Sequence, residues 1–512
     1  MNIRDVDPAL ILLHPADDVA ICRIQLMTGQ VVNGLPIQGL IPPGHKIALR
    51  DIAEGEPIRR YSQIIGFASK FIRAGEHVHT QNLEMGNFER DYAFTLDAKP
   101  AKDRRVASFM GIRRANGQVA TRNYIGILTT VNCSATVARG IADYYSKQAA
   151  SNPLQNFPHV DGVIALTHGA GCAMDDQGLG MQLLRRTLVG YARHPNFAAV
   201  LVVGLGCESN QINDMLKSGE LKEGDGERIQ TLNIQQAGGT RRAIELGVAH
   251  VGQMLLKANQ LHREPCGVEN LILGLQCGGS DSYSGISANP ALGYAVDLLV
   301  DHGGTAILSE TPEIYGAEHL LTRRAISEEV GKQLIDRIHW WDAYVRTNGS
   351  TLNNNPAPGN KAGGLTTILE KSLGAIAKGG TTNLNAVYQY AEEVRASGLV
   401  FMDTPGYDPV SATGQVAGGA NLICFTTGRG SAYGCAPTPS LKLSTNSDLW
   451  NRQQDDIDLN CGEIIDGSLT VAQVGEQIFE RLIETASGKL TKSEEHGYGQ
   501  NEFVPWALGA VL

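Results

Sequence analysis

The chain contains few charged residues and much glycine. Asp, Glu, Lys and Arg make up 19% of its 512 residues, against about 25% in an average globular protein. Glycine accounts for 59 residues, well above the usual share of about 7%. The nine hydrophobic residue types reach 42%, which excludes a disordered chain, because such chains have few apolar residues and a high net charge. The composition predicts a compact protein with many glycine-rich loops, and the length predicts several domains.

Basic residues are in the minority. The chain has 43 Lys and Arg against 53 Asp and Glu, with a formal net charge of −10, whereas a nucleic-acid-binding surface normally shows as a basic excess or patch. The longest uncharged stretch, 409–428, is rich in Ser, Thr, Gln, Asn and Gly and is too polar to cross a membrane. We therefore expect a small-molecule ligand, with neither nucleic acid nor a membrane as partner.

The nine cysteines are scattered and form no CxxC pair. An odd number of scattered cysteines favours reduced thiols over a disulfide framework. The N-terminal segment has Asp5 and Asp7 ahead of a short apolar run, which differs from the pattern of a secretion signal. We expect a cytoplasmic protein.

Several familiar catalytic motifs are missing. The sequence has no Walker A loop, no GxGxxG after a predicted strand, no HExxH and no GxSxG. These absences argue against nucleotide, dinucleotide and serine-hydrolase chemistry.

The hydrophobic pattern changes along the chain. Residues 1–90 contain short apolar or alternating runs between Pro- and Gly-rich turns, which is typical of a small β domain. Residues 91–107 are charged and irregular, as expected of a connector. Beyond them, continuous apolar runs alternate with amphipathic segments, which predicts an α/β fold with a mostly parallel sheet covered on both faces. A Gly- and Pro-rich span, 353–364, divides this region into a first α/β domain, 108–350, and a second, 351–512.

The expected elements of the α/β region are read from periodicity. The apolar runs that predict strands are 124–128, 162–166, 198–203, 270–275, 305–308, 398–402 and 422–425. The segments that predict helices are Thr136–Gln148, Thr240–Leu256, Ala317–His339, Thr366–Ala377 and Val471–Ala486. In the second of these, Ile244, Val248 and Val251 recur at helical spacing.

Polar groups and glycines follow nearly every predicted strand. In open α/β sheets, ligands bind outside the carboxyl ends of the strands, so the residues after each apolar run are candidate site residues. These candidates are Asn132, Cys133, His168, Cys172, Cys207, Glu208, Cys277, Ser280, Asp281, Glu310 and Arg429. Glycines beside them let the backbone approach a ligand closely, and a ring of hydroxyl, amide and carboxylate groups suits a polyhydroxylated substrate.

Some of these candidates have two interpretations. A single Cys at a strand end is often a small core residue, but four at predicted strand ends favour contact of at least one with metal or substrate. Arg429, in TTGRGSAYG, can clamp a carboxylate bidentately or order its own loop through an ion pair. Asn360 and Lys361, in NPAPGNKAGG, can polarise a substrate, although Lys361 also fits a solvated surface charge.

Three histidines of the β domain form a candidate metal site. His77 and His79 are two residues apart, so on a strand they point to the same face. Together with His45, in PPGHKIALRDI, they supply three imidazoles for a divalent metal. The alternative is an incidental HxH pair.

Long motifs then give a resemblance to a known family. The strings are PPGHKIALRDIAEGEPIRRYSQIIGFA with AGEHVH, RRANGQVATRN, VLVVGLGCESNQ, LQCGGSDSYSGISANPALG, SETPEIYGAEHLL, NPAPGNKAGGLTTILEKSLG and FTTGRGSAYG. From about residue 10 to the C-terminus, the chain resembles the altronate/galactarate dehydratase family. The resemblance implies an N-terminal SAF-type, β-clip-like domain followed by an α/β dehydratase region. It also implies a hydro-lyase that depends on Fe²⁺ or Mn²⁺ and acts on a six-carbon sugar acid.

Within the family, three segments favour one substrate. GEHVH at 75–79, ETPEIYGAE and CESNQ at 207–211 resemble the members that dehydrate altronate more than those that dehydrate galactarate, although RRAISEEVGK leans the other way. We expect conversion of D-altronate to 2-dehydro-3-deoxy-D-gluconate, with galactarate as the alternative substrate.

The reaction suggests a role for each candidate. Removal of the C2 proton of a carboxylate builds up negative charge that a metal or an Arg must neutralise. Loss of the C3 hydroxyl needs a general acid, or the metal as Lewis acid. We assign Arg429 and Lys361 to the carboxylate and His45, His77 and His79 to the metal. Proton transfer falls to Glu208, Glu310 or His168, and substrate binding to Asn132, Ser280, Asp281 and Asn360, together with Arg429.

Two alternatives stay open from the sequence. Three of the four thiols Cys133, Cys172, Cys207 and Cys277 can hold an iron–sulfur cluster in place of a mononuclear metal. A chain that binds a sugar acid as a sensor, without catalysis, is the non-enzymatic alternative. The acidic surface and the β domain are compatible with a homodimer.

Overall fold

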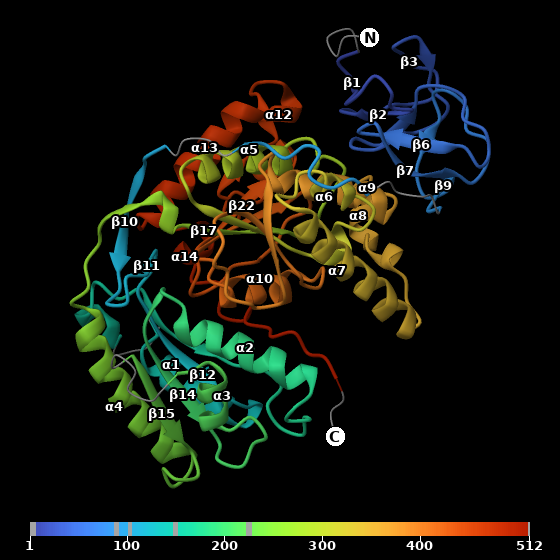
Figure 1. Ribbon diagram of the computed structural model, residues 1–512. Helices are drawn as coiled ribbons and strands as arrows, with labels where there is room; N and C mark the ends of the chain where they lie inside the picture. Colours follow the sequence, from blue (N-terminus) through green and yellow to red (C-terminus); the bar gives the residue numbers. More distant parts are fainter. Residues whose placement is uncertain (1–6, 87–91, 101–104, 147–151, 222–227, 510–512) are drawn as a thin grey trace.

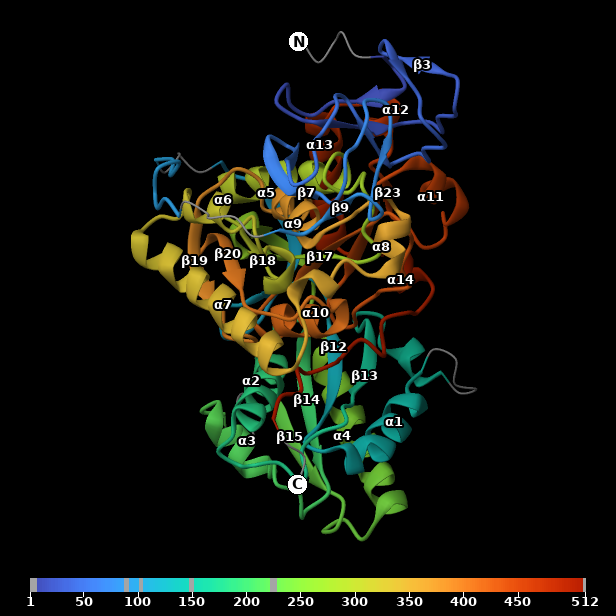
Figure 2. The same cartoon turned by 90° about the vertical axis from the view of Figure 1, so that its right-hand side faces the viewer.

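The computed structural model shows three domains arranged in a row. A small β domain lies at one end, an α/β domain at the other, and a larger α/β domain between them (Figures 1 and 2). The residues described are 7–86, 92–100, 105–146, 152–221 and 228–509. In the described part of the chain, no helix is both long enough and apolar enough to pass through a bilayer.

The N-terminal domain consists of short antiparallel strands, as predicted. One sheet has the order β1-β2-β5-β8, a second has the order β6-β7-β9, and β3 pairs with β4. The bounds are β1 Leu10–Ile11, β2 Val19–Cys22, β3 Val31–Val32, β4 Leu35–Pro36, β5 Lys46–Ala48, β6 Pro57–Arg60, β7 Gln63–Ala68, β8 His77–Val78 and β9 Leu83–Glu84. Ile47, Ile52, Ile65 and Val78 are fully buried, so alternate residues of these short strands form a continuous core.

The second domain is a doubly covered parallel sheet with the order β13-β12-β14-β15. Its strands are β12 Tyr124–Thr129, β13 Gly162–Leu166, β14 Phe197–Gly204 and β15 Ile229–Asn233. One face packs against α1 (Ala135–Tyr144) and α4 (Thr240–Ala258), and the other against α2 (Leu179–Arg193) and α3 (Ile212–Ser218). Because both faces are buried, the strands read as continuous apolar runs.

A small sheet joins the second domain to the third. It has the order β11-β10-β16 and pairs antiparallel. Its strands are β10 Ser108–Arg113, β11 Val119–Ala120 and β16 Glu264–Gly267. The chain enters the second domain through β10 and leaves it through β16. These two paired strands therefore form the connection between the second and third domains.

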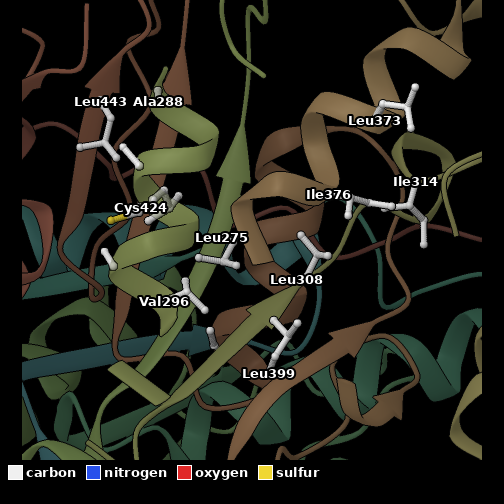
Figure 3. Packing of buried hydrophobic residues seen from close by; sticks show 14 of the residues in the cluster. Leu275, Ala288, Val296, Leu308, Ile314, Leu373, Ile376, Leu399, Cys424 and Leu443 are labelled. Carbon is white, nitrogen blue, oxygen red and sulfur yellow. The ribbon is translucent and has the colours of Figure 1, made fainter. Parts of the chain in front are cut away.

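The third domain is built on a seven-stranded parallel sheet with the order β19-β20-β18-β17-β21-β22-β23. Its strands are β17 Ile272–Cys277, β18 Thr305–Leu308, β19 Leu384–Tyr388, β20 Gly398–Met402, β21 Leu422–Thr427, β22 Ser440–Ser444 and β23 Leu459–Asn460. Helices α5 (Ala288–Asp301) and α13 (Val471–Ala486) cover one face, where Leu275, Leu308 and Leu399 meet α5 (Figure 3). Helix α10 (Asp408–Ala417) covers the other face and packs on α2.

The remaining helices lie around the rim of this sheet. They are α6 His319–Thr322, α7 Glu328–Thr347, α8 Pro358–Ala362, α9 Ile368–Ile376, α11 Ser447–Arg452, α12 Glu463–Asp466 and α14 Lys492–Glu495. The segment predicted as one helix over 317–339 forms α6 and α7, separated where Ser327 caps α7 by accepting from the Val330 N–H. Helices α2, α5 and α10 have no counterpart among the predicted helices.

The third domain corrects the predicted domain boundary. A division at 350/351 falls inside the seven-stranded sheet, because β18 pairs with β20 across about ninety residues of intervening chain. The two sheets are instead separated between Ala258, the end of α4, and Ile272, the start of β17. Of the connector predicted at 91–107, residues 91 and 101–104 lie outside the described residues.

The N-terminal domain is held on the third domain by a buried carboxylate. Glu370, on α9, accepts from Lys46 Nζ at 2.9 Å and from Arg60 at 2.6 Å, and all three side chains are almost completely buried. Burial alone would raise the pKa of Glu370, but the charges of Lys46 and Arg60 and hydrogen bonds from Thr366 and Lys46 lower it to about 2. Glu370 therefore stays ionised although buried, because two cations and Thr366 surround it.

Glu370→Gln should destabilise the folded protein. The substitution leaves Lys46 and Arg60 buried without their counter-charge, and breaking a buried pair in this way costs about 3–5 kcal/mol. The measurement is the midpoint of urea unfolding followed by circular dichroism. Glu328→Gln, which removes an exposed pair with Lys332, is the control and should leave the midpoint in place.

The same carboxylate sets a pH dependence. Because the pKa of Glu370 is lower in the folded state than its ordinary value, its stabilisation is complete above that ordinary value and is lost as pH falls toward 2. The difference in urea-unfolding midpoint between the wild-type protein and Glu370→Gln should therefore become smaller below about pH 4.5. Equal midpoints for Glu370→Gln and Glu328→Gln at pH 7 would contradict the assignment.

Candidate active site

The three predicted metal-binding histidines lie together in the N-terminal domain. His77 opens β8, His79 follows it, and Ile47 of β5 pairs with His77. His45 is two residues before Ile47, so it lies on the same face of the sheet as His77 and His79. The ring centroids are separated by 5.0 Å (His45 to His77), 4.8 Å (His45 to His79) and 5.4 Å (His77 to His79).

The donor set of this cluster fits a divalent metal ion. One ligand atom from each ring lies within 4.8 Å of the others, and the buried Nδ1 of His79 has no hydrogen-bond partner among the described residues. Burial lowers the pKa of all three rings, to about 4 for His77 and about 3 for His79. The imidazoles are therefore neutral near pH 7, which is the form that binds metal.

The histidine cluster faces a segment of the third domain. His45 Nε2 is 3.3 Å from the carbonyl oxygen of Ala362, the last residue of α8. Lys361, half-buried, is the preceding residue. Asn360 is buried, and its amide donates to the Ser280 carbonyl at 2.8 Å, so it fixes α8 to the loop after β17.

The loop after β17 is held by Asp281. Its buried carboxylate accepts from Thr445 Oγ1 at 3.0 and 2.9 Å and from Ser284 Oγ at 3.0 Å. Asn446 Nδ2 donates to it at 3.1 Å. These bonds occupy the carboxylate, so Asp281 positions the loop that carries Ser280.

Arg429 lies at the same rim. It is exposed, and its Cβ lies 3.2 Å from where a Cβ on Gly279 would stand. The rim therefore joins several predicted site residues at the carboxyl edge of the seven-stranded sheet, next to the N-terminal domain. They are His45, His77, His79, Ser280, Asp281, Asn360, Lys361 and Arg429.

A second group of ionisable side chains is buried at the same edge of the sheet. Cys277 ends β17 and Glu310 follows β18, and Lys378 Nζ lies 2.9 Å from the Cys277 sulfur and 3.0 Å from Glu310 Oε2. Lys371 bonds Glu313 at 2.7 Å. Cys277, Glu310 and Glu313 have ligand atoms within 4.8 Å of one another, so this acid–base cluster is the second site in the described residues with the spacing of a metal site.

Glu310 has unusual properties within this cluster. Its backbone adopts a left-handed conformation with φ of 68°, and Oε1 is buried without a hydrogen-bond partner among the described residues. Burial raises its pKa to about 7, with Lys378 opposing the rise and Glu313 adding to it. Burial likewise raises the pKa of Asp408 to about 6. Left-handed backbone and shifted pKa values are common at functional sites.

A small cavity lies between the rim and α9. It has a volume of about 10 Å³ and is lined by Ser280 and Asp281 from the rim and by Glu370 and Lys371 from α9, which is room for about one water molecule. Glu370 and Lys371 are consecutive residues, so α9 contacts both the N-terminal domain and the acid–base cluster.

Sequence reasoning missed part of this cluster. Glu313, Lys371, Lys378 and Asp408 were not candidates, because they meet only through the tertiary fold. Glu313 lies three residues after Glu310 in ETPEIYGAE, and that spacing was the one available signal.

The remaining predicted residues lie in the second domain. Asn132, His168 and Glu208 follow its strands, as do Cys133, Cys172 and Cys207. The structure does not bring them to the histidine cluster, which lies in the domain at the opposite end of the molecule (Figures 1 and 2). Cys277 alone of the four candidate thiols belongs to the third domain, where it is buried.

Comparison with known proteins accounts for all three domains. The altronate/galactarate dehydratase SAF domain matches residues 8–86, the D-galactarate dehydratase/altronate hydrolase second domain matches 111–259, and the D-galactarate/altronate dehydratase C-terminal region matches 268–511. The chain belongs to the altronate/galactarate dehydratase family. The matched ranges coincide with the three structural domains.

Three relatives match this member of the family over nearly its full length. The altronate dehydratase of Escherichia coli (strain K12) is 35% identical over 98% of this chain and 99% of its own. The galactarate dehydratase (L-threo-forming) of the same organism is 37% identical over 96% of this chain and 95% of its own. The altronate dehydratase of Bacillus subtilis (strain 168) is 33% identical over 98% of this chain and 100% of its own.

Glu310 should titrate near neutral pH. Its raised pKa of about 7 means that the carboxyl is protonated at pH 6 and ionised at pH 8, and difference infrared spectroscopy detects the protonated form as a carbonyl band. We expect this band to weaken between pH 6 and 8 in the wild-type protein and to weaken less in Glu310→Gln. The exposed Glu392→Gln is the matched control and should behave like wild type. Identical difference spectra for wild type and Glu310→Gln would contradict the assignment.

Proposed function

We propose that this chain is a metal-dependent hydro-lyase that dehydrates a six-carbon sugar acid, converting D-altronate to 2-dehydro-3-deoxy-D-gluconate and water. The observation that carries the proposal is the histidine cluster packed against α8, where Lys361 and Arg429 share the rim with three neutral imidazoles. Full-length similarity to two altronate dehydratases supports the substrate class.

His45, His77 and His79 would hold Fe²⁺ or Mn²⁺. Bound there, the ion would act as a Lewis acid toward substrate oxygens. The rings are already positioned for this role, because the contact of His45 with the Ala362 carbonyl and the pairing of β5 with β8 fix their places.

Lys361 and Arg429 supply positive charge where the reaction develops negative charge. Loss of the C2 proton turns the substrate carboxylate toward a dianionic form, and a guanidinium can bind both carboxylate oxygens at once. Asn360 and Asp281 shape this rim through the loop bonds described above, and the buried Ser280 is fixed in the same loop.

Glu310 is the candidate for proton transfer. Of the three residues proposed for this role, it alone shares a domain with Lys361 and Arg429. A pKa of about 7 lets it take and return a proton near neutral pH. Its carboxyl is buried beside Lys378, in the same cluster as Lys371, which lines the small cavity next to Ser280.

His168 and Glu208 already have other partners. His168 Nε2 bonds the Thr129 carbonyl at 2.9 Å, and its Nδ1 accepts from the Ala170 N–H at 3.2 Å. Glu208 Oε1 accepts from Thr130 Oγ1 in the loop after β12, and Oε2 accepts from the Gly206 N–H of its own loop. These contacts support a role for both residues in shaping the second domain.

Galactarate is the second candidate substrate. The galactarate dehydratase is 37% identical to this chain, so overall similarity does not separate the two sugar acids. A sensor that binds a sugar acid without turnover is tested by the same assay. A cytoplasmic location and a homodimer stay predictions.

The proposed reaction is tested with a substrate panel. Incubation with D-altronate and with galactarate, followed by a colour assay for 2-keto-3-deoxy acids, should give product with D-altronate. A chelator should abolish turnover and added Fe²⁺ or Mn²⁺ restore it. After loading with Mn²⁺ alone, His77→Ala should hold much less Mn²⁺ than the wild-type protein by elemental analysis. Turnover of galactarate alone would identify galactarate, in place of D-altronate, as the substrate. Binding of both sugar acids without product would favour the alternative of a sensor without catalysis.

Arg429→Ala should lower kcat/KM by about 100-fold, because loss of one preorganised charge-stabilising donor costs about 10²–10³-fold in rate. Arg429→Lys should restore part of the loss, since it keeps the charge but not the planar fork. Arg241→Ala, which removes an exposed arginine of the second domain, is the control. The three variants are compared by steady-state kinetics. A kcat/KM near the wild-type value for Arg429→Ala would show that the substrate carboxylate does not bind at Arg429.

A further inference from the structure

The exposed cysteines of this chain gather in one place. All nine cysteines lie in the described residues and are unpaired, and six of them are buried. The three exposed ones, Cys133, Cys172 and Cys207, follow β12, β13 and β14. These strands are neighbours in the second domain's parallel sheet, so their carboxyl ends meet at one edge. Cysteine is among the most buried residue types, which makes three exposed thiols at one edge unusual.

The three loops that carry these thiols are bonded to one another in a closed ring. The N–H of Asn132, next to Cys133, donates to the Ala170 carbonyl at 3.0 Å. The carbonyl of Gly171, next to Cys172, accepts from the Asn210 N–H at 3.0 Å. The ring closes through Glu208, next to Cys207.

Glu208 connects the third loop back to the first. Its Oε1 accepts from Thr130 Oγ1 at 2.7 Å and its Oε2 from the Gly206 N–H at 2.6 Å. Asn210 Nδ2 adds a bond to the Thr130 carbonyl at 3.1 Å. Each thiol is therefore adjacent to a residue that fixes its loop to another of the three, and the thiols are held on one rigid edge.

Glycine allows the loops to approach this closely. Gly171 has φ of 106°, and a Cβ there would stand 2.2 Å from the Thr130 carbonyl oxygen. Gly206 has φ of 127°, and its Cβ would meet the side chain of Gln235 at 2.5 Å. Gln235 Nε2 in turn donates to the Cys207 sulfur at 3.3 Å, a contact that suits a sulfur carrying negative charge.

The three exposed thiols do not form a compact site for a single ion. Bonds of about 2.3 Å from a metal to sulfur place two sulfurs on one tetrahedral ion about 4 Å apart. In the described part of the chain, the groups whose ligand atoms all lie within 4.8 Å of one another are the histidine cluster and the cluster of Cys277, Glu310 and Glu313. The three exposed sulfurs are spread more widely.

Two other candidate ligands that follow the same strands, His168 and Glu208, already have hydrogen-bond partners. Both ring nitrogens of His168 are engaged with backbone groups. Both oxygens of Glu208 accept hydrogen bonds, one from Thr130 and one from its own loop. Cys133 lies in the turn that leads into α1, a helix of ten residues, and the positive end of its dipole favours an anionic group.

We propose that Cys133, Cys172 and Cys207 bind an iron–sulfur cluster of the [4Fe–4S] type, in which one iron has no protein ligand and is open to an oxygen-donor molecule. Thiolates are the usual ligands of such clusters. The site is separate from the histidine cluster and does not rest on the proposed function. Cys277, the remaining candidate thiol, is excluded from it because it is buried beside Lys378 in the third domain.

The test is anaerobic reconstitution of the full-length protein with Fe³⁺, sulfide and dithiothreitol, where the dithiol reduces part of the iron to give the mixed-valence cluster. We expect about four sulfide ions per chain and about four iron ions in addition to the iron held by the histidine cluster, a brown colour with visible charge-transfer absorption, and an electron paramagnetic resonance signal after reduction with dithionite. Iron bound without sulfide would overturn the proposal, as would one zinc ion held by the three thiols in preference to the cluster.

Variants assign the ligands. Cys133→Ser, Cys172→Ser and Cys207→Ser should each lower the bound sulfide several-fold, whereas Cys266→Ser, at a buried cysteine of β16, should load like wild type. His77→Ala should keep its sulfide, so failure of the histidine metal site and failure of the cluster site are distinguishable. A triple Cys→Ser protein that binds as much iron and sulfide as the wild-type protein would contradict the assignment.

Alkylation gives a second readout that does not depend on how well a variant folds. In the protein without added iron, iodoacetamide followed by mass spectrometry should label Cys133, Cys172 and Cys207 first, because these are the exposed thiols. Loading should protect all three together by at least about ten-fold. Equal labelling before and after loading would contradict cluster binding.

Discussion

The position of the N-terminal domain depends on one buried carboxylate. Glu370 is surrounded by Lys46 and Arg60 from that domain and by Thr366 from its own segment. A charge without counter-ions is strongly disfavoured in the protein interior. The carboxylate therefore stays ionised only while Lys46 and Arg60 of the N-terminal domain contact it. The histidine cluster faces α8 as a consequence of these contacts, since His45 directly precedes Lys46 in the chain.

The carboxyl edge of the seven-stranded sheet is where the rest of the candidate site collects. Parallel strands bring the segments that follow them to one edge, and here those segments carry a thiol, carboxylates and an exposed arginine. The N-terminal domain covers this edge and adds imidazoles that the sheet itself lacks. The site is thus composite: neutral imidazole nitrogens come from one domain, and charged groups come from another.

Much of this arrangement could be read from the sequence, and the limits have physical reasons. His77 and His79 were found because a strand has a period of two, and the residues after each apolar run were found because strand ends share an edge. Lys378 and Glu313 were missed because their partners lie far away in the sequence and no periodicity marks them. Helix α10 was missed because it is buried on nearly every side, so it lacks the polar face by which a helix is recognised.

The domain boundary shows a similar limit. A Gly- and Pro-rich span around residue 355 resembles a linker, yet it belongs to the long crossover that brings β20 beside β18. Sequence order alone does not show that β18 pairs with a strand so much later in the chain. The match of the family's C-terminal region begins at residue 268, and the sheet topology also divides the two α/β domains before that residue.

The adjacency of Glu370 and Lys371 in α9 has a consequence for how the enzyme can vary. One residue faces the cations of the N-terminal domain and the next faces Glu313, so a rotation or shift of this single helical turn would disturb both contacts. The contact between the two domains and the charge balance of the buried carboxyls therefore both depend on the same turn of α9. Neither can be redesigned alone, and substitutions in one domain have to be compatible with charges that lie in the other.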